Sequence, residues 1–136
     1  SSAASDVYKR QYLAKHGRPT SVEDLQQHSC LLYLQLGRIY DKWRLGNRTV
    51  QVSGPLFSDD ADVVRRWALL GDGIAYKSWL DVSANIAAGE LEVLLPEQPG
   101  EHTPVTLVCP HRKQLSPAVS QLHLWLRDRF AALQPQ

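Results

Sequence analysis

Residues 58–79 read SDDADVVRRWALLGDGIAYKSW, and this stretch decides the expected fold. One hydroxyl and three carboxylates open it, and apolar residues then recur at helical spacing. Gly71 and Gly73 end this pattern before the short apolar run at residues 74–76. The order predicts a helix followed directly by a strand, which is one α/β unit. Ligands of α/β sheets commonly bind where strands end and helices begin, so both ends of this unit are candidate binding positions.

The predicted helix has an apolar face and a polar face. Asp62, Arg65 and Arg66 are expected to be mostly in solvent. The residues expected to face the core are Val63, Val64, Trp67, Ala68 and Leu70. A helix of this kind covers one face of a sheet.

Upstream, residues 30–34 form a continuous apolar run of strand length. The run suits a strand buried on both faces, so we expect it at the centre of a mixed sheet. Before it, Gly17 is expected to end a helix at residues 12–16. Ser21 and Asp24 have the spacing of a capping box and predict a second short helix.

Three further segments have strand patterns. Residues 42–53 alternate apolar and polar side chains on either side of Gly46 and Asn47, which predicts a β-hairpin. Residues 91–95 alternate in the same way and predict an edge strand. Residues 105–109 are rich in β-branched and apolar side chains and predict another strand.

Two more helices are expected downstream. Residues 81–88 predict one, ended by Gly89, and its inward residues are expected to be Val82, Ile86 and Ala87. The last helix is expected to be capped by Ser116, with Pro117 in its first turn. Its apolar stripe comprises Val119, Leu122, Leu126, Phe130 and Leu133.

Length and composition exclude some classes of protein and of binding partner. The 136 residues suffice for one compact domain. Fifteen basic and fourteen acidic side chains leave no positive excess for a phosphate backbone, so this chain alone is not expected to bind DNA. No apolar run approaches the roughly 20 residues that cross a bilayer, and no secretion signal is recognisable. We therefore expect a soluble cytoplasmic protein. The chain lacks methionine and is expected to be a fragment.

Cysteine, histidine and tryptophan patterns give no sign of a metal or cofactor. Cys30 and Cys109 lie far apart without C-x-x-C spacing, so buried thiols of a reducing compartment are favoured over a disulfide or a metal site. The five histidines form no metal-ligand or acid/base pattern. Core packing is expected for Trp43, Trp67 and Trp125, whereas Trp79 follows a strand exit and is expected at the rim of the cleft.

Short motifs along residues 12–133 resemble, in order and spacing, the effector-binding domain of LysR-type transcriptional regulators. They include YLAKHGRP at 12–19, EDL at 23–25, WR at 43–44, VSG at 52–54, GDGIA at 71–75, GEL at 89–91, LLP at 94–96 and LSP at 115–117. Each motif is short, and the resemblance rests on their common order.

The resemblance implies an α/β fold of the periplasmic-binding-protein-like type 2 class, with two subdomains and a small-molecule effector in the cleft between them. Residues 12–112 would form most of the second subdomain, a mixed central sheet flanked by helices. Residues 113–136 would supply a C-terminal helix that packs on the first subdomain, most of which is missing. Residues 1–11 depart from the family pattern and are expected to be a non-native lead-in.

The resemblance also implies which residues line this side of the cleft. The effector-binding residues it indicates are Tyr33, Leu34, Gln35, Ser58, Asp59, Ala75, Tyr76 and Lys77. For Ser58, capping of the following helix is an equally good explanation. Asp59, Asp60 and Asp62 would repel an anionic effector unless Lys77 or a residue of the missing first subdomain compensates, so a neutral or mixed-charge effector is expected at least as readily. A lysine at a strand exit is more commonly just solvated, which is the competing interpretation of Lys77.

The implied function is the inducer-sensing part of a LysR-type regulator, which controls transcription allosterically. DNA would be bound only through a winged helix-turn-helix that is absent here, and the full-length regulator would be a homo-oligomer. No enzyme activity, cofactor, metal or membrane partner is expected, because no catalytic or nucleotide-binding motif is present. The alternative is a fragment of a solute-binding receptor or small-molecule enzyme on a similar fold.

Overall fold

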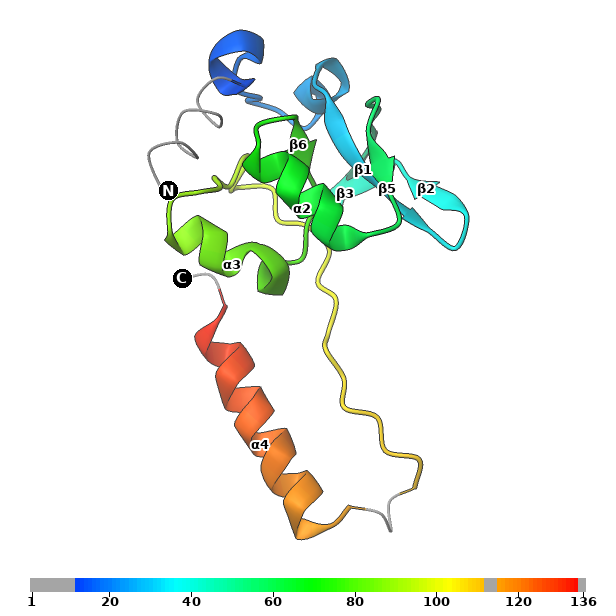
Figure 1. The fold of residues 1–136 in the computed structure, drawn as a ribbon, viewed down its shortest axis with the longest axis vertical. Coiled ribbons are helices and arrows are strands. Elements are labelled where there is room, and N and C mark those ends of the chain that lie inside the picture. Colours follow the sequence, from blue (N-terminus) through cyan, green and yellow to red (C-terminus); the bar gives the residue numbers. More distant parts are fainter. Residues whose placement is uncertain (1–11, 112–114, 135–136) are drawn as a thin grey trace. The chain divides into compact units, whose positions relative to one another are not determined.

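A computed structural model describes residues 12–111 and 115–134 (Figure 1). The chain forms two compact units, of which the first ends at Glu101 and the second begins at His102. The expected lead-in at residues 1–11 lies outside the described residues.

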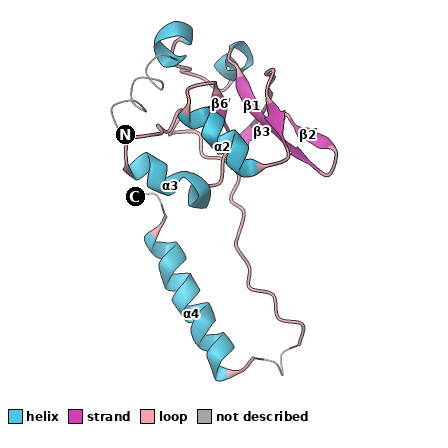
Figure 2. Ribbon diagram, in the orientation of Figure 1, coloured by secondary structure: helices cyan, strands magenta, loops and turns pink. Residues whose placement is uncertain are grey.

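A mixed sheet forms the centre of the first unit (Figure 2). Its central strand β1 (Cys30–Gln35) pairs antiparallel with β2 (Arg38–Tyr40) and parallel with both β5 (Phe57–Ser58) and β6 (Ile74–Ala75). The prediction of a central strand in a mixed sheet is thereby confirmed.

The first half of β1 is covered on both faces. Cys30, Leu31 and Leu32 are all buried, and successive strand residues point to opposite faces. Cys30 and Leu32 belong to the main apolar core, which also contains Trp43. The helix α2 (Ala61–Leu69) contacts β1 and contributes the buried Val64. A continuous apolar run is required here because neither face of this first half of β1 reaches solvent.

A two-residue turn joins β1 to β2. Leu36 and Gly37 both have positive φ angles, 49° and 75°, and Gln35 pairs with Arg38 across the turn. Positive φ at both central residues gives the twist that tight hairpins need, although Leu adopts it less readily than Gly or Asn. The Leu36 side chain is 97% exposed.

The predicted hairpin at residues 42–53 is also confirmed. Strands β3 (Lys42–Leu45) and β4 (Arg48–Gln51) pair antiparallel, with Trp43 opposite Val50. Both of these side chains are buried, which confirms core packing for Trp43.

The N-terminal helical segments follow their capping signals. Residues 12–16 are helical and end at Gly17, whose φ is 78°. Ser21 Oγ accepts the Asp24 N–H at 3.3 Å, and Asp24 Oδ2 accepts the Ser21 N–H at 3.1 Å. This reciprocal pair has the hydrogen bonds of the predicted capping box and spans the start of the short 3₁₀ helix η1 (Glu23–Gln27), although the N-cap is Val22 and not Ser21.

The central α/β unit forms as predicted, but its helix is less buried than expected. Only Val64 is fully buried, Val63, Trp67 and Ala68 are partly exposed, and Leu70 is 55% exposed. The interpretation of Leu70 as a core residue is wrong because the helix ends at Leu69 and Leu70 is its C-cap.

The following helix α3 (Trp79–Ala87) starts two residues before the predicted position and ends as expected at Gly89, whose φ is 73°. Val82 is buried, Ile86 is partly buried and Ala87 is exposed, so the inward placement of Ala87 is wrong. Trp79 is partly buried.

The strands predicted at 91–95 and 105–109 are wrong. Residues 91–95 form only bends and irregular backbone, and Leu95 is buried in a left-handed conformation with a φ of 53°. Residues 102–109 have no regular secondary structure, and Val108 is 80% exposed. A strand needs a hydrogen-bonded neighbour, and none pairs with these segments in the described part of the chain.

The second unit contains the helix α4 (Pro117–Ala132). Ser116 Oγ accepts the Val119 N–H at 3.2 Å and Pro117 lies in the first turn, as predicted. No residue of α4 is buried, and Trp125 is 56% exposed, so its expected core packing is wrong. Of the helices at the described positions, none is long and apolar enough to cross a membrane.

Candidate functional site

The strand register brings two of the predicted effector-binding residues side by side. Tyr33 on β1 pairs with Ser58 on β5, and both lie toward the carboxyl ends of parallel strands. Each is partly exposed. Leu34 and Gln35 follow Tyr33 on β1, and Gln35 also lines a shallow groove beside the β1–β2 turn. Parallel strands commonly present ligand-binding groups at this end.

Ser58 is not the N-cap of α2, and this corrects the capping explanation. It is the last residue of β5, and its Oγ accepts the Asp60 N–H at 3.0 Å. The N-cap is Asp60, whose Oδ1 accepts the Asp62 N–H at 2.9 Å. A hydroxyl that accepts one hydrogen bond still has its own hydrogen to donate. Ser58 can therefore donate to a ligand while its loop conformation stays fixed.

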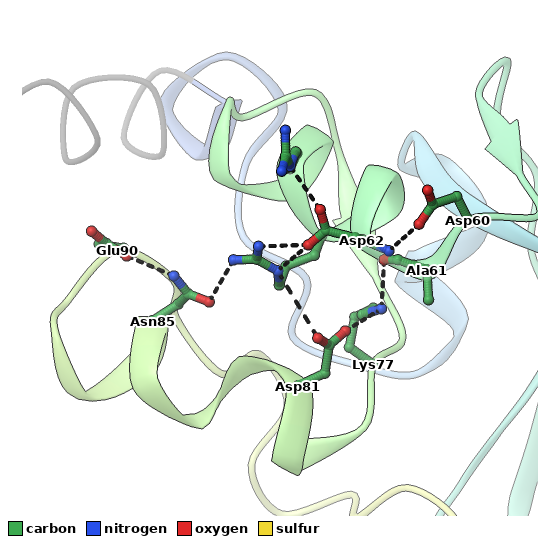
Figure 3. A network of polar contacts seen from close by, with 9 residues as sticks. Asp60, Ala61, Asp62, Lys77, Asp81, Asn85 and Glu90 are labelled. Atoms are coloured by element: carbon green, nitrogen blue, oxygen red, sulfur yellow. Dashed lines mark hydrogen bonds and ion pairs between the residues drawn. The ribbon is translucent and has the colours of Figure 1, made fainter.

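Lys77 forms a cross-link between two helix starts (Figure 3). Its Nζ donates to the Ala61 carbonyl oxygen, in the first turn of α2, at 2.8 Å. It also forms an ion pair with Asp81, in the first turn of α3. Only 12% of the Lys77 side chain is exposed, so the interpretation of a simply solvated lysine is wrong.

The Asp62 carboxylate is compensated by two arginines on the same helix. Arg65 Nη2 donates to Asp62 Oδ1 at 2.6 Å, and Arg66 Nε donates to Oδ2 at 2.8 Å. The hydrogen bond from Arg65, followed by the charges of both arginines, lowers the pKa of Asp62. Of the three aspartates at this helix start, Asp62 therefore adds little negative potential at the candidate site.

Arg65 also extends the network to α3. Its Nη1 donates to Asn85 Oδ1 at 3.2 Å, and Asn85 Nδ2 donates to Glu90 Oε2 at 2.7 Å. The Arg65 side chain is 24% exposed, so it is not mostly in solvent as predicted. This α2–α3 network was missed from the sequence. The spacings from Asp62 to Arg65 and from Lys77 to Asp81 were available signals, whereas the Arg65–Asn85 contact is long-range.

Ala75 ends the strand β6, and Tyr76 follows it and leads into Lys77. Ala75 pairs with Leu31 on β1 and is partly buried. The Tyr76 ring stacks on Trp43, with ring centroids 5.6 Å apart, and its hydroxyl donates to the Arg44 carbonyl oxygen at 3.0 Å. The structure thus directs the Tyr76 side chain to the β3–β4 hairpin, whereas Lys77 reaches the starts of α2 and α3.

Cys30 and Cys109 are both free; Cys30 is fully buried, as predicted, and Cys109 is only partly buried. Burial raises the pKa of the Cys30 thiol to about 12. Within residues 12–111 and 115–134, no three His, Cys, Asp or Glu side chains gather as a metal site.

The family model of the LysR substrate binding domain matches residues 7–131. The transcriptional regulator DmlR of Escherichia coli K12 is 40% identical over 91 residues, which cover 64% of this chain and 30% of DmlR. The regulator CrgA of Neisseria meningitidis serogroup C, strain 8013, is 36% identical over 97 residues, which cover 68% of this chain and 32% of CrgA. The chain thus spans about a third of the length of these relatives.

Solved structures give the same result. The regulatory domain of CrgA matches with a TM-score of 0.59 and 32% identity, over 66% of this chain and 45% of that one. This match and the mixed sheet confirm the α/β, periplasmic-binding-protein-like type 2 fold. The chain belongs to the LysR substrate-binding domain family, the effector-binding part of LysR-type transcriptional regulators.

Proposed function

We propose that this chain forms one wall of a cleft that binds a small-molecule effector. The observation that carries the proposal is the pairing of Tyr33 with Ser58 at the carboxyl ends of β1 and β5, directly before α2. Two hydroxyl groups that can donate or accept hydrogen bonds suit a small polar ligand. Leu34, Gln35 and Asp59 would extend this wall.

The other end of the α/β unit completes the proposed wall. Ala75 and the backbone of Tyr76 would border the ligand at the exit of β6. Lys77 would act by its charge and by holding the start of α2, since its ammonium group is already bonded to Ala61 and Asp81. With Asp62 compensated, Asp59 and Asp60 supply the negative charge that the effector meets. A neutral or mixed-charge effector fits this wall better than a simple anion.

The mechanism we infer is a population shift. An effector that binds one arrangement of the regulatory domain better than another displaces the equilibrium toward it, and a LysR-type regulator would pass this change to its DNA-binding segment. The relatives DmlR and CrgA are helix-turn-helix-type transcriptional regulators, which supports DNA binding by a segment other than this chain. Such a regulator would work as a homo-oligomer in the cytoplasm, where bacterial DNA lies, and would need no enzyme activity or cofactor.

A thermal-shift screen of small metabolites on the full-length regulator tests the proposal. Once a compound raises the melting temperature, its Kd is measured for Ser58→Ala and Tyr33→Phe. Loss of one hydrogen bond should weaken binding roughly three- to tenfold. Ser120→Ala is the matched control, because Ser120 lies on α4 and should leave the Kd unchanged. If neither site variant changes the Kd, the proposed wall is wrong.

A further inference from the structure

The Tyr76 hydroxyl has two protein partners. It donates to the Arg44 carbonyl oxygen at 3.0 Å and accepts the Glu101 N–H at 2.6 Å. The ring is fixed by its stacking on the buried Trp43. A phenol has one hydrogen to donate, so little capacity is left for a ligand. The Tyr76 side chain therefore has a task other than effector contact.

Glu101, whose N–H donates to the Tyr76 hydroxyl, lies at the boundary between the two compact units. Glu101 is the last residue of the first compact unit, and the second unit begins at the next residue. The residues that follow, 102–109, have no regular secondary structure, and residues 102–108 are exposed. The hydrogen bond to Tyr76 thus holds the last residue before a long irregular connection.

Other contacts hold the same short segment, residues 99–101. Tyr40 donates its hydroxyl to Glu101 Oε2 at 3.0 Å, and this hydrogen bond raises the pKa of Tyr40. The Gly46 N–H donates to the Pro99 carbonyl oxygen at 2.7 Å. Gly100 packs so closely that an added Cβ would lie 2.7 Å from the Tyr76 hydroxyl oxygen. Contacts from the β3–β4 turn, from β2 and from the residue after β6 therefore converge on three residues.

We propose that Tyr76 and Tyr40 form a clamp that fixes the point where the chain leaves the first unit. The Tyr76 side chain then positions the regulatory domain and does not contact the effector. Its chain neighbours Ala75 and Lys77 belong to the proposed effector wall, so a ligand that displaces the end of β6 would also move the hydroxyl that holds Glu101. This coupling rests on the proposed function, whereas the clamp itself does not.

Amide hydrogen exchange followed by NMR tests the clamp in the full chain without any ligand. Tyr76→Phe keeps the ring and its stacking on Trp43 but removes the hydroxyl. We expect the Glu101 amide to exchange roughly three- to tenfold faster. The Leu32 amide, which donates to the Leu56 carbonyl oxygen at 3.1 Å inside the sheet, should keep its rate. If Tyr76→Phe instead lowers the stability of the whole unit, the exchange rates of the Glu101 and Leu32 amides should rise together.

A second measurement is the rate of proteolytic cleavage after Glu101. The Glu-specific V8 protease cleaves after glutamate, and mass spectrometry identifies cleavage between Glu101 and His102. Tyr76→Phe should accelerate this cut severalfold, whereas Tyr33→Phe, which removes a hydroxyl elsewhere on the sheet, should not. Unchanged exchange at Glu101 together with unchanged cleavage in Tyr76→Phe would overturn the clamp.

Gly100→Ala gives an independent variant in case Tyr76→Phe loosens the whole unit. Its methyl group would displace the clamped segment from the Tyr76 hydroxyl, so it should give the same local signature with an unchanged Leu32 amide. Failure of the proposed function has a different signature. Tyr33→Phe would then leave the effector Kd unchanged, while the response of Glu101 to Tyr76→Phe would persist.

Discussion

Cys30 lies at the start of β1, where its Sγ is 3.5 Å from the Leu25 carbonyl oxygen. Burial raises the pKa of its thiol to about 12, so almost no thiolate exists at neutral pH. The thiolate is the form that reacts with alkylating reagents. In the variant Cys109→Ser, Cys30 should therefore resist iodoacetamide in the native state and react only in denaturant. Mass spectrometry measures this, and equal rates in both conditions would contradict the prediction.

The same pKa predicts sensitivity to alkali. The folded-state pKa lies above the ordinary value of 9.0, so the stabilisation from burying the neutral thiol is complete below pH 9. It is lost as the pH rises from 9 toward 12, by up to about 1.4 kcal/mol per pH unit. Urea unfolding between pH 8 and pH 10.5 should show this decline, and Cys30→Ala should remove that part of the slope.

Single residues also show where prediction from sequence ends. The burial of Cys30 followed from its apolar neighbours alone. The sequence does not decide whether Ser58 or Asp60 is the N-cap of α2, because both residues have capping chemistry and lie two positions apart. The pairing of Ser58 with Tyr33 extends β5 through Ser58 and moves the helix start to Ala61. That outcome depends on a contact between strands distant in sequence.

At the scale of elements, the Lys77 cross-link fastens the start of α3 to the start of α2. Because Lys77 is 12% exposed and Asp81 35% exposed, the pair is partly protected from water. A double-mutant cycle of Lys77→Met and Asp81→Asn should give a coupling free energy of about 1 kcal/mol in urea unfolding. The pair Arg127 and Asp128 on α4 is exposed and is the matched control, with coupling near zero. Equal coupling in the two pairs would contradict a special role for Lys77.

Asp62 predicts a pH dependence of α2. Its folded-state pKa is lowered by Arg65 and Arg66, so its contribution to stability is present above the ordinary carboxyl pKa of 3.8. The contribution is lost as the pH falls below that value and the carboxylate is protonated. Asp62→Asn should therefore reduce stability at pH 7 but have less effect near pH 2.5. Urea unfolding followed by circular dichroism measures the stability at both pH values. An equal loss of stability at pH 7 and near pH 2.5 would argue against the ion pairs.

Helices and strands differed in how well the sequence predicted them. Helix ends followed local signals, such as the capping box of Ser21 with Asp24 and the left-handed Gly89. The segments 91–95 and 105–109 have good strand patterns, yet neither forms a strand, because a strand depends on a partner that the pattern does not encode. The α2–α3 network at the candidate site escaped prediction for the same reason, since Arg65 and Asn85 are 20 positions apart.

At the scale of the whole molecule, the second unit carries exposed apolar residues on α4, and exposed apolar patches commonly mark interaction surfaces. Leu122, Trp125 and Leu133 are all exposed, and a helix of 16 residues gains most of its stability from packing an apolar face. We expect the chain to self-associate through this helix. Light scattering should give a mass that rises with protein concentration, and Trp125→Glu should shift the mass toward the monomer. A clean monomer with a frayed C-terminus would contradict this expectation.

The turn at Leu36 and Gly37 has a practical consequence for biosensor design. It follows Tyr33 by three residues, its first side chain is almost wholly in solvent, and the two strands it joins are already in register. A circularly permuted fluorescent protein inserted between Leu36 and Gly37 would sit beside the proposed effector wall without replacing a core residue. Its brightness would then report movements of β1 in living cells, which would allow the effector to be sought by imaging.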